Sequence, residues 1–200
     1  GASEMALHLL LLDKLSLFHN QYPGVRLRIT NDSTPQAITA LVRGQIDCAV
    51  ITTPTHIPKS LRETSLLSFQ EILLCGDQYR ELASRTRKLR DLEPYPFICL
   101  SEHTATYAFY QRLFIRNNLP FRVDMEAATM DQVFPMIQHN LGIGFYSETL
   151  AAPAIERGKV FPVRLAEPVP KREVCLIEDT SRPQSVAMKA LKQLLCSHTA

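Results

Sequence analysis

The side chains best placed for chemistry in this sequence are hydroxyls that follow apolar runs. In "ITNDSTPQAITALVRGQIDCAVI" (residues 29–51), Ser33 and Thr34 precede a helix-like segment that Gly44 stops. Such hydroxyls cap helix N-termini, and Pro35 suits a helix start because its missing N–H would be unpaired there anyway. Helix capping is one interpretation. The other is half of a ligand site, since the free N–H groups of a helix start attract anions.

Hydroxyl residues precede helix-like segments in both halves of the chain, although no sequence repeat is detectable. In the first half, Ser3 precedes the first Leu-rich segment as Ser33 and Thr34 precede the next one. Later, "SEHTATY" (residues 101–107) follows the apolar run "FICL", and Thr129 precedes "MDQVFPMIQHN". Each half is therefore predicted to contain a strand, a hydroxyl-rich cap, a helix and a returning strand.

The hydrophobic pattern predicts alternating strands and helices, which with short connections indicates a parallel sheet covered by helices. The predicted helices are 4–21, 35–43, a polar stretch at 79–90, one within 101–127, 129–139 and 183–196. The predicted strands are 25–30, 47–52, 95–100, one at the end of 101–127, and 142–147, with long extended runs at 61–79 and 160–178. We interpret Asn140 as a left-handed residue after a helix, and Pro135 as an anomaly inside that helix.

Apolar residues fall on two faces of the first predicted helix. Leu7, Leu11, Leu15, Phe18 and Tyr22 form one stripe, and Met5, Leu9 and Leu12 form a second. One stripe is enough to cover a sheet. The second therefore predicts an interface, because contiguous exposed apolar patches usually mark one.

Composition narrows the function classes. The chain has 200 residues, 46% apolar and 21% charged, with a net charge of +2. This near-neutral balance argues against DNA binding by this chain alone, and we interpret the basic cluster at 85–90 as a solvated face.

Five scattered cysteines without metal spacing suggest a reducing compartment. No apolar run spans a bilayer, and no G-x-S-x-G, H-E-x-x-H or phosphate-loop motif occurs. We therefore expect no enzyme activity, metal, cofactor or membrane partner.

Several motifs together resemble the effector-binding domain of LysR-type transcriptional regulators. They are "GAS" before a Leu-rich helix, "YPGVRLRI", "ALVRGQIDCAVI" and "IQHNLGIGFYS", in the family's order over the whole chain. The resemblance implies an α/β fold of two Rossmann-like subdomains joined by two crossover strands, like type 2 periplasmic binding proteins. Subdomain I would be residues 1–70 and 172–200, and subdomain II residues 71–171. Gly1 is not a natural initiator, so we expect a winged helix-turn-helix DNA-binding domain upstream, absent from this chain.

The resemblance also implies a small-molecule effector in the cleft between the subdomains, where strand-to-helix turns meet. The expected ligand-binding residues are Ser3, Met5, Ser33, Thr34, Thr52, Ser101, His103, Thr104, Thr106 and Thr129. For each hydroxyl alone, helix capping stays open, and His103 is equally compatible with an exposed loop. Thr52 stands where some relatives that bind dicarboxylates carry a cationic side chain, which disfavours a strongly charged ligand. We expect a small organic acid or amino-acid-like metabolite.

Family likeness further implies a homodimer, or a tetramer in the full-length protein, in which the first helix packs against residues 130–139 of the partner. The expected interface residues are Met5, Leu9, Leu12, Gln132, Met136 and His139. DNA would be contacted only through the missing domain, and the protein would be cytoplasmic. Two alternatives stay open: an extracytoplasmic solute-binding receptor of a transporter, and an enzyme that shares the fold.

Overall fold

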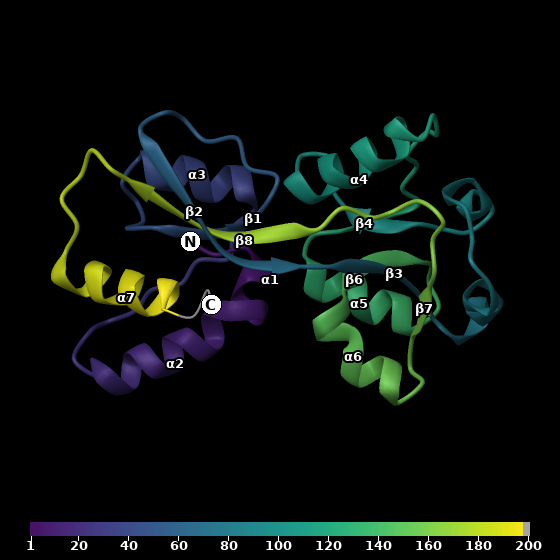
Figure 1. Cartoon of the computed structure of the whole chain (residues 1–200), viewed down its shortest axis with the longest axis horizontal. Coiled ribbons are helices and arrows are strands. Elements are labelled where there is room, and N and C mark those ends of the chain that lie inside the picture. The colour runs from purple at the N-terminus through teal and green to yellow at the C-terminus, as the bar shows by residue number, and fades with distance from the viewer. Residues whose placement is uncertain (198–200) are drawn as a thin grey trace. The chain divides into compact units, whose positions relative to one another are not determined.

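The computed structural model describes residues 1–197 (Figure 1). The chain divides into two compact units: unit 1, Gly1–Ser68 with Glu173–Ala200, and unit 2, Phe69–Arg172. The chain therefore passes between the units twice. Residues 198–200, which end the range predicted for subdomain I, lie outside the described residues.

Unit 1 is built on a three-stranded sheet of order β1-β8-β2, in which β1 and β8 are antiparallel and Ile51 lies opposite Cys175. Its elements are α1 (Glu4–Ala6), η1 (Leu7–Leu11), α2 (Leu12–Gln21), α3 (Thr34–Val42), β1 (Ala49–Thr52), β2 (Leu61–Phe69), β8 (Arg172–Asp179) and α7 (Val186–Cys196). The sheet is extended at β1 by two parallel bridges, from Val50 to Ala2 and from Ala2 to Asn31.

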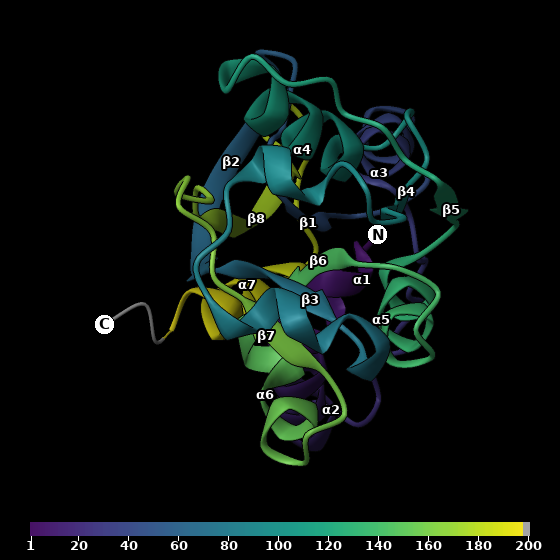
Figure 2. The same ribbon diagram turned by 90° about the vertical axis from the view of Figure 1, so that its right-hand side faces the viewer.

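Unit 2 contains β3 between β6 and β7, both antiparallel to it (Figure 2). Strands β4 and β5 are parallel, and a parallel bridge joins Phe97 to Ile143 just before β6. Its elements are β3 (Glu71–Cys75), η2 (Asp77–Ser84), η3 (Leu89–Leu92), β4 (Ile98–Leu100), α4 (Ala105–Arg116), β5 (Met125–Ala127), α5 (Met130–Gln138), β6 (Gly144–Ser147), α6 (Glu148–Glu156) and β7 (Phe161–Val163).

The two units share one order of segments. In each, three parallel segments lie side by side, and the strand next to the third runs antiparallel to it: β8 beside β1, and β3 beside β6. The predicted parallel segments are present in both units, but the sheets are mixed, because the long crossover strands add antiparallel pairs to them. In unit 2 each parallel segment leads into a helix, whereas in unit 1 the segments at Ala2 and Asn31 lead into helices and β1 leads through residues 53–60 into β2. Within each unit the helix starts lie at one sheet edge, which is the arrangement that matters for a ligand.

Each unit has its own apolar core. In unit 1, α3 packs on the sheet through Ala37, Ile38 and Leu41 against β1 and β8. In unit 2, aromatic side chains dominate, and Tyr110 stacks on Phe145 with ring centroids 4.5 Å apart. Cys75, Cys99 and Cys175 are buried, Cys48 and Cys196 are partly buried, and all five cysteines are free.

The first helix differs from its prediction in phase. Residues 4–21 are helical throughout, but Leu7–Leu11 form a π-helix, which has more residues per turn and rotates the faces on either side of it. Met5 is consequently only 3% exposed whereas Leu12 is 49% exposed, so these two do not share one open stripe.

The strand predicted at 25–30 was wrong. Only Asn31 forms a bridge, and Thr30 and Asp32 provide the backbone hydrogen bonds to Ala2. Since this segment lies at the sheet edge, side chains such as Ile29 stay exposed and the alternating pattern appears without a ladder.

The structure tests the interpretations of Asn140 and Pro135. Asn140 has φ of 61°, so its predicted left-handed conformation is confirmed, and Pro135 does lie inside α5. Sequence reasoning missed α6, which contains Pro153. Among the described residues, no helix is both long enough and apolar enough to cross a membrane.

Candidate functional site

Three chain segments meet at one edge of unit 1. Ala2 N donates to Thr30 O (2.9 Å), Asp32 N donates to Ala2 O (3.0 Å), and Ser3 N donates to Val50 O (3.0 Å). Because the three segments run parallel, the residues that follow them emerge at one edge. The structure thereby brings together Ser3, Ser33, Thr34 and Thr52, at the N-termini of two helical runs.

At this edge, the hydroxyl protons of Ser33 and Thr34 already form hydrogen bonds within the protein. Ser33 donates from both N (3.0 Å) and Oγ (2.8 Å) to Gln36 Oε1, and Thr34 Oγ1 donates to Thr52 O (3.2 Å). Thr34 is 6% exposed and Thr52 is 3% exposed. The oxygens of Ser33 and Thr34 are therefore left as acceptors toward any further group.

Ser3 Oγ is different. It is buried, and it has no hydrogen-bond partner among the described residues. A buried hydroxyl without a partner costs about 1–3 kcal/mol of desolvation that nothing offsets. A ligand atom at this point would supply the missing hydrogen-bond partner. The sequence predicted Ser3 as a site residue from its place before a helix, not from its unsatisfied hydroxyl.

Unit 2 has a corresponding edge. Leu100 on β4 lies opposite Ala127 on β5, so the turns that follow these parallel strands emerge together. In the first turn, Thr104 Oγ1 donates to Ser101 O (2.8 Å) and accepts from Tyr107 N (3.1 Å), which caps α4. The second turn reaches Thr129, the residue before α5, which makes no side-chain capping bond.

His103 lies in the first of these turns, and its side chain is exposed. Its side chain is 88% exposed, and Nε2 is 4.0 Å from Glu102 Oε1. Of its two open interpretations, this geometry favours the exposed loop residue. In contrast, Thr106 is buried at 8% exposure in the first turn of α4.

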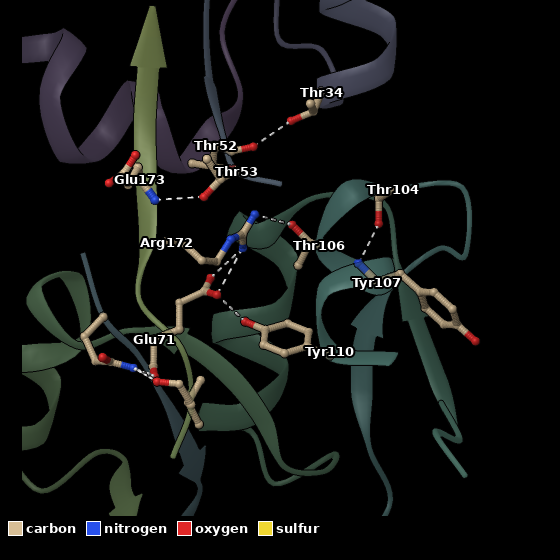
Figure 3. Close-up of polar contacts among 12 residues, drawn as sticks. Thr34, Thr52, Thr53, Glu71, Thr104, Thr106, Tyr107, Tyr110, Arg172 and Glu173 are labelled. Carbon is tan, nitrogen blue, oxygen red and sulfur yellow. Dashed lines mark hydrogen bonds and ion pairs between the residues drawn. The ribbon is translucent and has the colours of Figure 1, made fainter. Parts of the chain in front are cut away.

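Sequence reasoning missed a buried polar network in unit 2 (Figure 3). Arg172 Nη1 donates to Glu71 Oε1 (3.1 Å) and Oε2 (3.0 Å), and Nη2 donates to Thr106 Oγ1 (3.2 Å). Tyr110 donates its hydroxyl to Glu71 Oε2 (2.6 Å). Both charged side chains are 0% exposed. The available signals were charged residues at the start of apolar strands ("QEILLC" and "KREVCL") and the Thr106–Tyr110 spacing of four on one helix face.

The buried surroundings keep Tyr110 and Arg172 each in one protonation state. Burial, followed by the nearby Glu71 carboxylate, raises the pKa of Tyr110 well above its usual value, so the phenol stays protonated as a donor. Burial alone would lower the pKa of Arg172, but the interactions with the Glu71 carboxylate and with Tyr110 together outweigh it, and the pKa is raised. The guanidinium therefore stays charged and paired.

The residues expected at a dimer interface are not equally accessible. Leu12 and His139 are exposed, and Met136 is partly buried, whereas Met5 belongs to the buried set. Gln132 is exposed, and its Oε1 accepts from Ala128 N (2.9 Å). Within either unit taken by itself, the described residues contain no cluster of three His, Cys, Asp or Glu side chains able to hold a metal ion.

Known proteins resemble this chain along its whole length. A family described as "LysR substrate binding domain" matches residues 1–200. A probable RuBisCO transcriptional regulator of Cyanophora paradoxa is 25% identical over 198 residues, covering 96% of this chain and 61% of the relative. The chain thus spans about three fifths of that relative's length.

Solved structures show the fold. The Synechocystis PCC6803 CcmR regulatory domain, in complex with 2-PG, has a TM-score of 0.83 at 18% identity, covering 98% of this chain and 94% of that one. The effector-binding domain of QuiR, in complex with shikimate, has a TM-score of 0.82 at 15% identity, covering 98% and 92%. The predicted α/β fold, two-subdomain and type 2 periplasmic-binding-like, is confirmed. With the family match over its full length, the chain belongs to the LysR substrate-binding domain family.

Proposed function

We propose that this chain is the effector-binding domain of a LysR-type transcriptional regulator. It would bind a small metabolite and transmit this event to a DNA-binding domain elsewhere in the full-length protein. The family match and the relative named as a transcriptional regulator support this proposal. They favour it over a transporter's solute receptor, and the proposal assigns the chain no catalytic role. A regulator that contacts DNA would work in the cytoplasm.

The observation that carries the proposal is the unsatisfied Ser3 Oγ at the edge of unit 1. It lies where the N-termini of two helical runs emerge, and helix N-termini stabilise a nearby anion by about 0.3–1 kcal/mol each at exposed sites. Ser33 and Thr34 offer acceptor oxygens there, because their protons are already used. A ligand that combines an anionic group with its own donors would satisfy this set.

A small organic acid or amino-acid-like metabolite has this combination. The titles of two similar structures name 2-PG and shikimate, and these compounds are reasonable first probes. We propose that ligand contacts come from the residues at the two sheet edges: Ser3, Met5, Ser33, Thr34 and Thr52 in unit 1, and Ser101, His103, Thr104, Thr106 and Thr129 in unit 2. The two units would be regulatory subdomains I and II, with the ranges given above.

The partners in this proposal are the effector, a second copy of the chain and, through the upstream domain, DNA. The second copy would contact Leu9 and Leu12 of the first helical run, together with Gln132, Met136 and His139 on and just after α5. A two-fold interface of this kind is isologous, so each contact occurs twice. Ligand binding would bias the regulator only if the effector bound its conformational states unequally.

A thermal-shift screen of organic acids and amino acids on residues 1–200 tests the proposal. A true effector at 100 times its dissociation constant should add about 2.7 kcal/mol to stability. In a gel-shift assay, the full-length regulator should bind its operator and residues 1–200 should not, because the fragment's net charge is only +2. Tight, sequence-dependent DNA binding by the fragment would contradict the proposal.

A further inference from the structure

Glu71 and Arg172 lie next to the two places where the chain passes between the units. Glu71 begins β3 shortly after β2 ends at Phe69, and Arg172 is the last residue of unit 2. The Arg172 guanidinium holds both carboxylate oxygens of Glu71, at 3.0 and 3.1 Å. The two crossover segments are therefore tied to each other on the unit 2 side of the boundary.

The same pair also holds a helix. Thr106 and Tyr110 lie one turn apart on α4, and each bonds to a different member of the pair: Thr106 accepts from Arg172, and Tyr110 donates to Glu71 (Figure 3). Both α4 residues are buried. The first turns of α4 are thus fixed to the starts of β3 and β8 by directed, charge-assisted hydrogen bonds, which are the stronger kind.

Stability alone is a weak explanation for this arrangement. A buried ion pair is often no more stabilising than apolar residues of similar volume, because removing two charges from water offsets their attraction. The planar guanidinium does supply something that an apolar residue lacks, which is several donors in a fixed geometry. Since Arg172 donates to Thr106 Oγ1, it also leaves the Thr106 proton for another acceptor.

We propose that Arg172 is a positioning residue for the N-terminal turn of α4, acting through Thr106. It keeps Thr104 and Thr106 in a defined place relative to both crossover segments, and it aims the Thr106 hydroxyl as a donor. The inference rests on the proposed function in treating this turn as part of the effector site. In this arrangement, the Thr106 hydroxyl would donate to an acceptor oxygen of the ligand.

Hydrogen exchange of the ligand-free protein tests the positioning. In the turn, Tyr107 N and Ala108 N bond to the hydroxyl and carbonyl oxygens of Thr104, so these two amides report its order. Arg172→Lys replaces the guanidinium by a compact ammonium that cannot hold Glu71 and Thr106 in the same way. We expect both amides to exchange about tenfold faster or more, with the amides of α5 unchanged.

Three controls separate positioning from general loosening. Thr106→Val keeps the ion pair and the Tyr110–Glu71 hydrogen bond and removes only the hydrogen bond between Arg172 and Thr106, so it should accelerate the same amides even if Arg172→Lys fails to fold. If Arg172 acts through Thr106, the double variant should be no worse in these amides than the more affected single variant. Arg122→Lys is the matched control, since the Arg122–Asp124 pair (3.1 Å) has an 84% exposed arginine in the same unit.

Unchanged exchange in Thr106→Val, or equal acceleration throughout unit 2 in both variants, would overturn the inference. Fully additive effects in the double variant would also overturn it. These measurements need no ligand. A positive result therefore stands even if the metabolite screen fails, and a failed exchange experiment leaves the proposed effector binding untouched.

Discussion

Replacing Arg172 by Met isolates the energetics of the buried network. The change leaves the Glu71 carboxylate buried, with the Tyr110 hydroxyl as the remaining partner from the network. Removing one partner of a buried ion pair costs about 3–5 kcal/mol, because an uncompensated charge stays in the interior. Since whole domains are stable by only about 5–15 kcal/mol, Arg172→Met should place the protein near its folding limit.

A second substitution should reverse part of this loss. In Glu71→Leu with Arg172→Met, no buried charge remains, and apolar replacements of an ion pair are often neutral or stabilising. Tyr110 and Thr106 lose their partners, which costs about 1–3 kcal/mol for each group left unsatisfied. The double variant should therefore be more stable than Arg172→Met alone, although it carries more changes.

Urea denaturation of residues 1–200 followed by circular dichroism measures these differences as shifts in midpoint. Arg122→Met is the control, because an exposed pair contributes about 0–1 kcal/mol. A double variant no more stable than Arg172→Met would refute the reasoning. So would a loss below about 1 kcal/mol for Arg172→Met.

Three further predictions concern pH, backbone and assembly. Burial raises the pKa of Cys99 and Cys175 from the usual 9.0 to about 12, so these thiols ionise first in the unfolded chain. The urea midpoint should therefore be unaffected by them below pH 9 and should fall as the pH rises toward 12. A midpoint that rises over this range would contradict the prediction. Asn140 has φ of 61°, so Asn140→Ala should lose about 1–2 kcal/mol in urea denaturation and Asn140→Gly less, whereas equal losses would exclude backbone strain as the cause. Sedimentation should detect a dimer that Leu9→Glu with Leu12→Glu converts to monomer or aggregate, and a wild-type monomer at micromolar concentration would rule out the interface.

Local signals predicted much of the fold. Hydroxyl residues directly precede α3, α4 and α5 at Ser33, Thr104 and Thr129, so a single sequence reveals these helix starts, although Thr129 makes no side-chain capping bond. The turn at Asn140 was equally local. Element α6 was missed because Pro153 interrupts its pattern directly after a short strand. The sequence therefore predicts elements best where the determinants lie within one turn.

Interactions between distant residues were beyond sequence reasoning. Glu71 and Arg172 are 101 positions apart, and no spacing rule connects a charge in one strand with a charge in another. Met5 was assigned to an open stripe on the assumption of regular α-helical phase, which the π-helix at Leu7–Leu11 changes. In the candidate site, residue types were predictable, whereas the unsatisfied state of Ser3 Oγ needed the packing around it.

The most direct test of effector binding is a pair of measurements on Ser3→Ala. Because Ser3 Oγ is buried without a hydrogen-bond partner in residues 1–197, removing it should leave stability unchanged or raise it. If that hydroxyl bonds to the effector, calorimetric titration with the strongest compound from the metabolite screen should give an affinity lower by about 1–3 kcal/mol. Ser16→Ala, an exposed serine on α2, should change neither quantity. Equal affinity of Ser3→Ala and the wild type would contradict the assignment of this edge as the effector site.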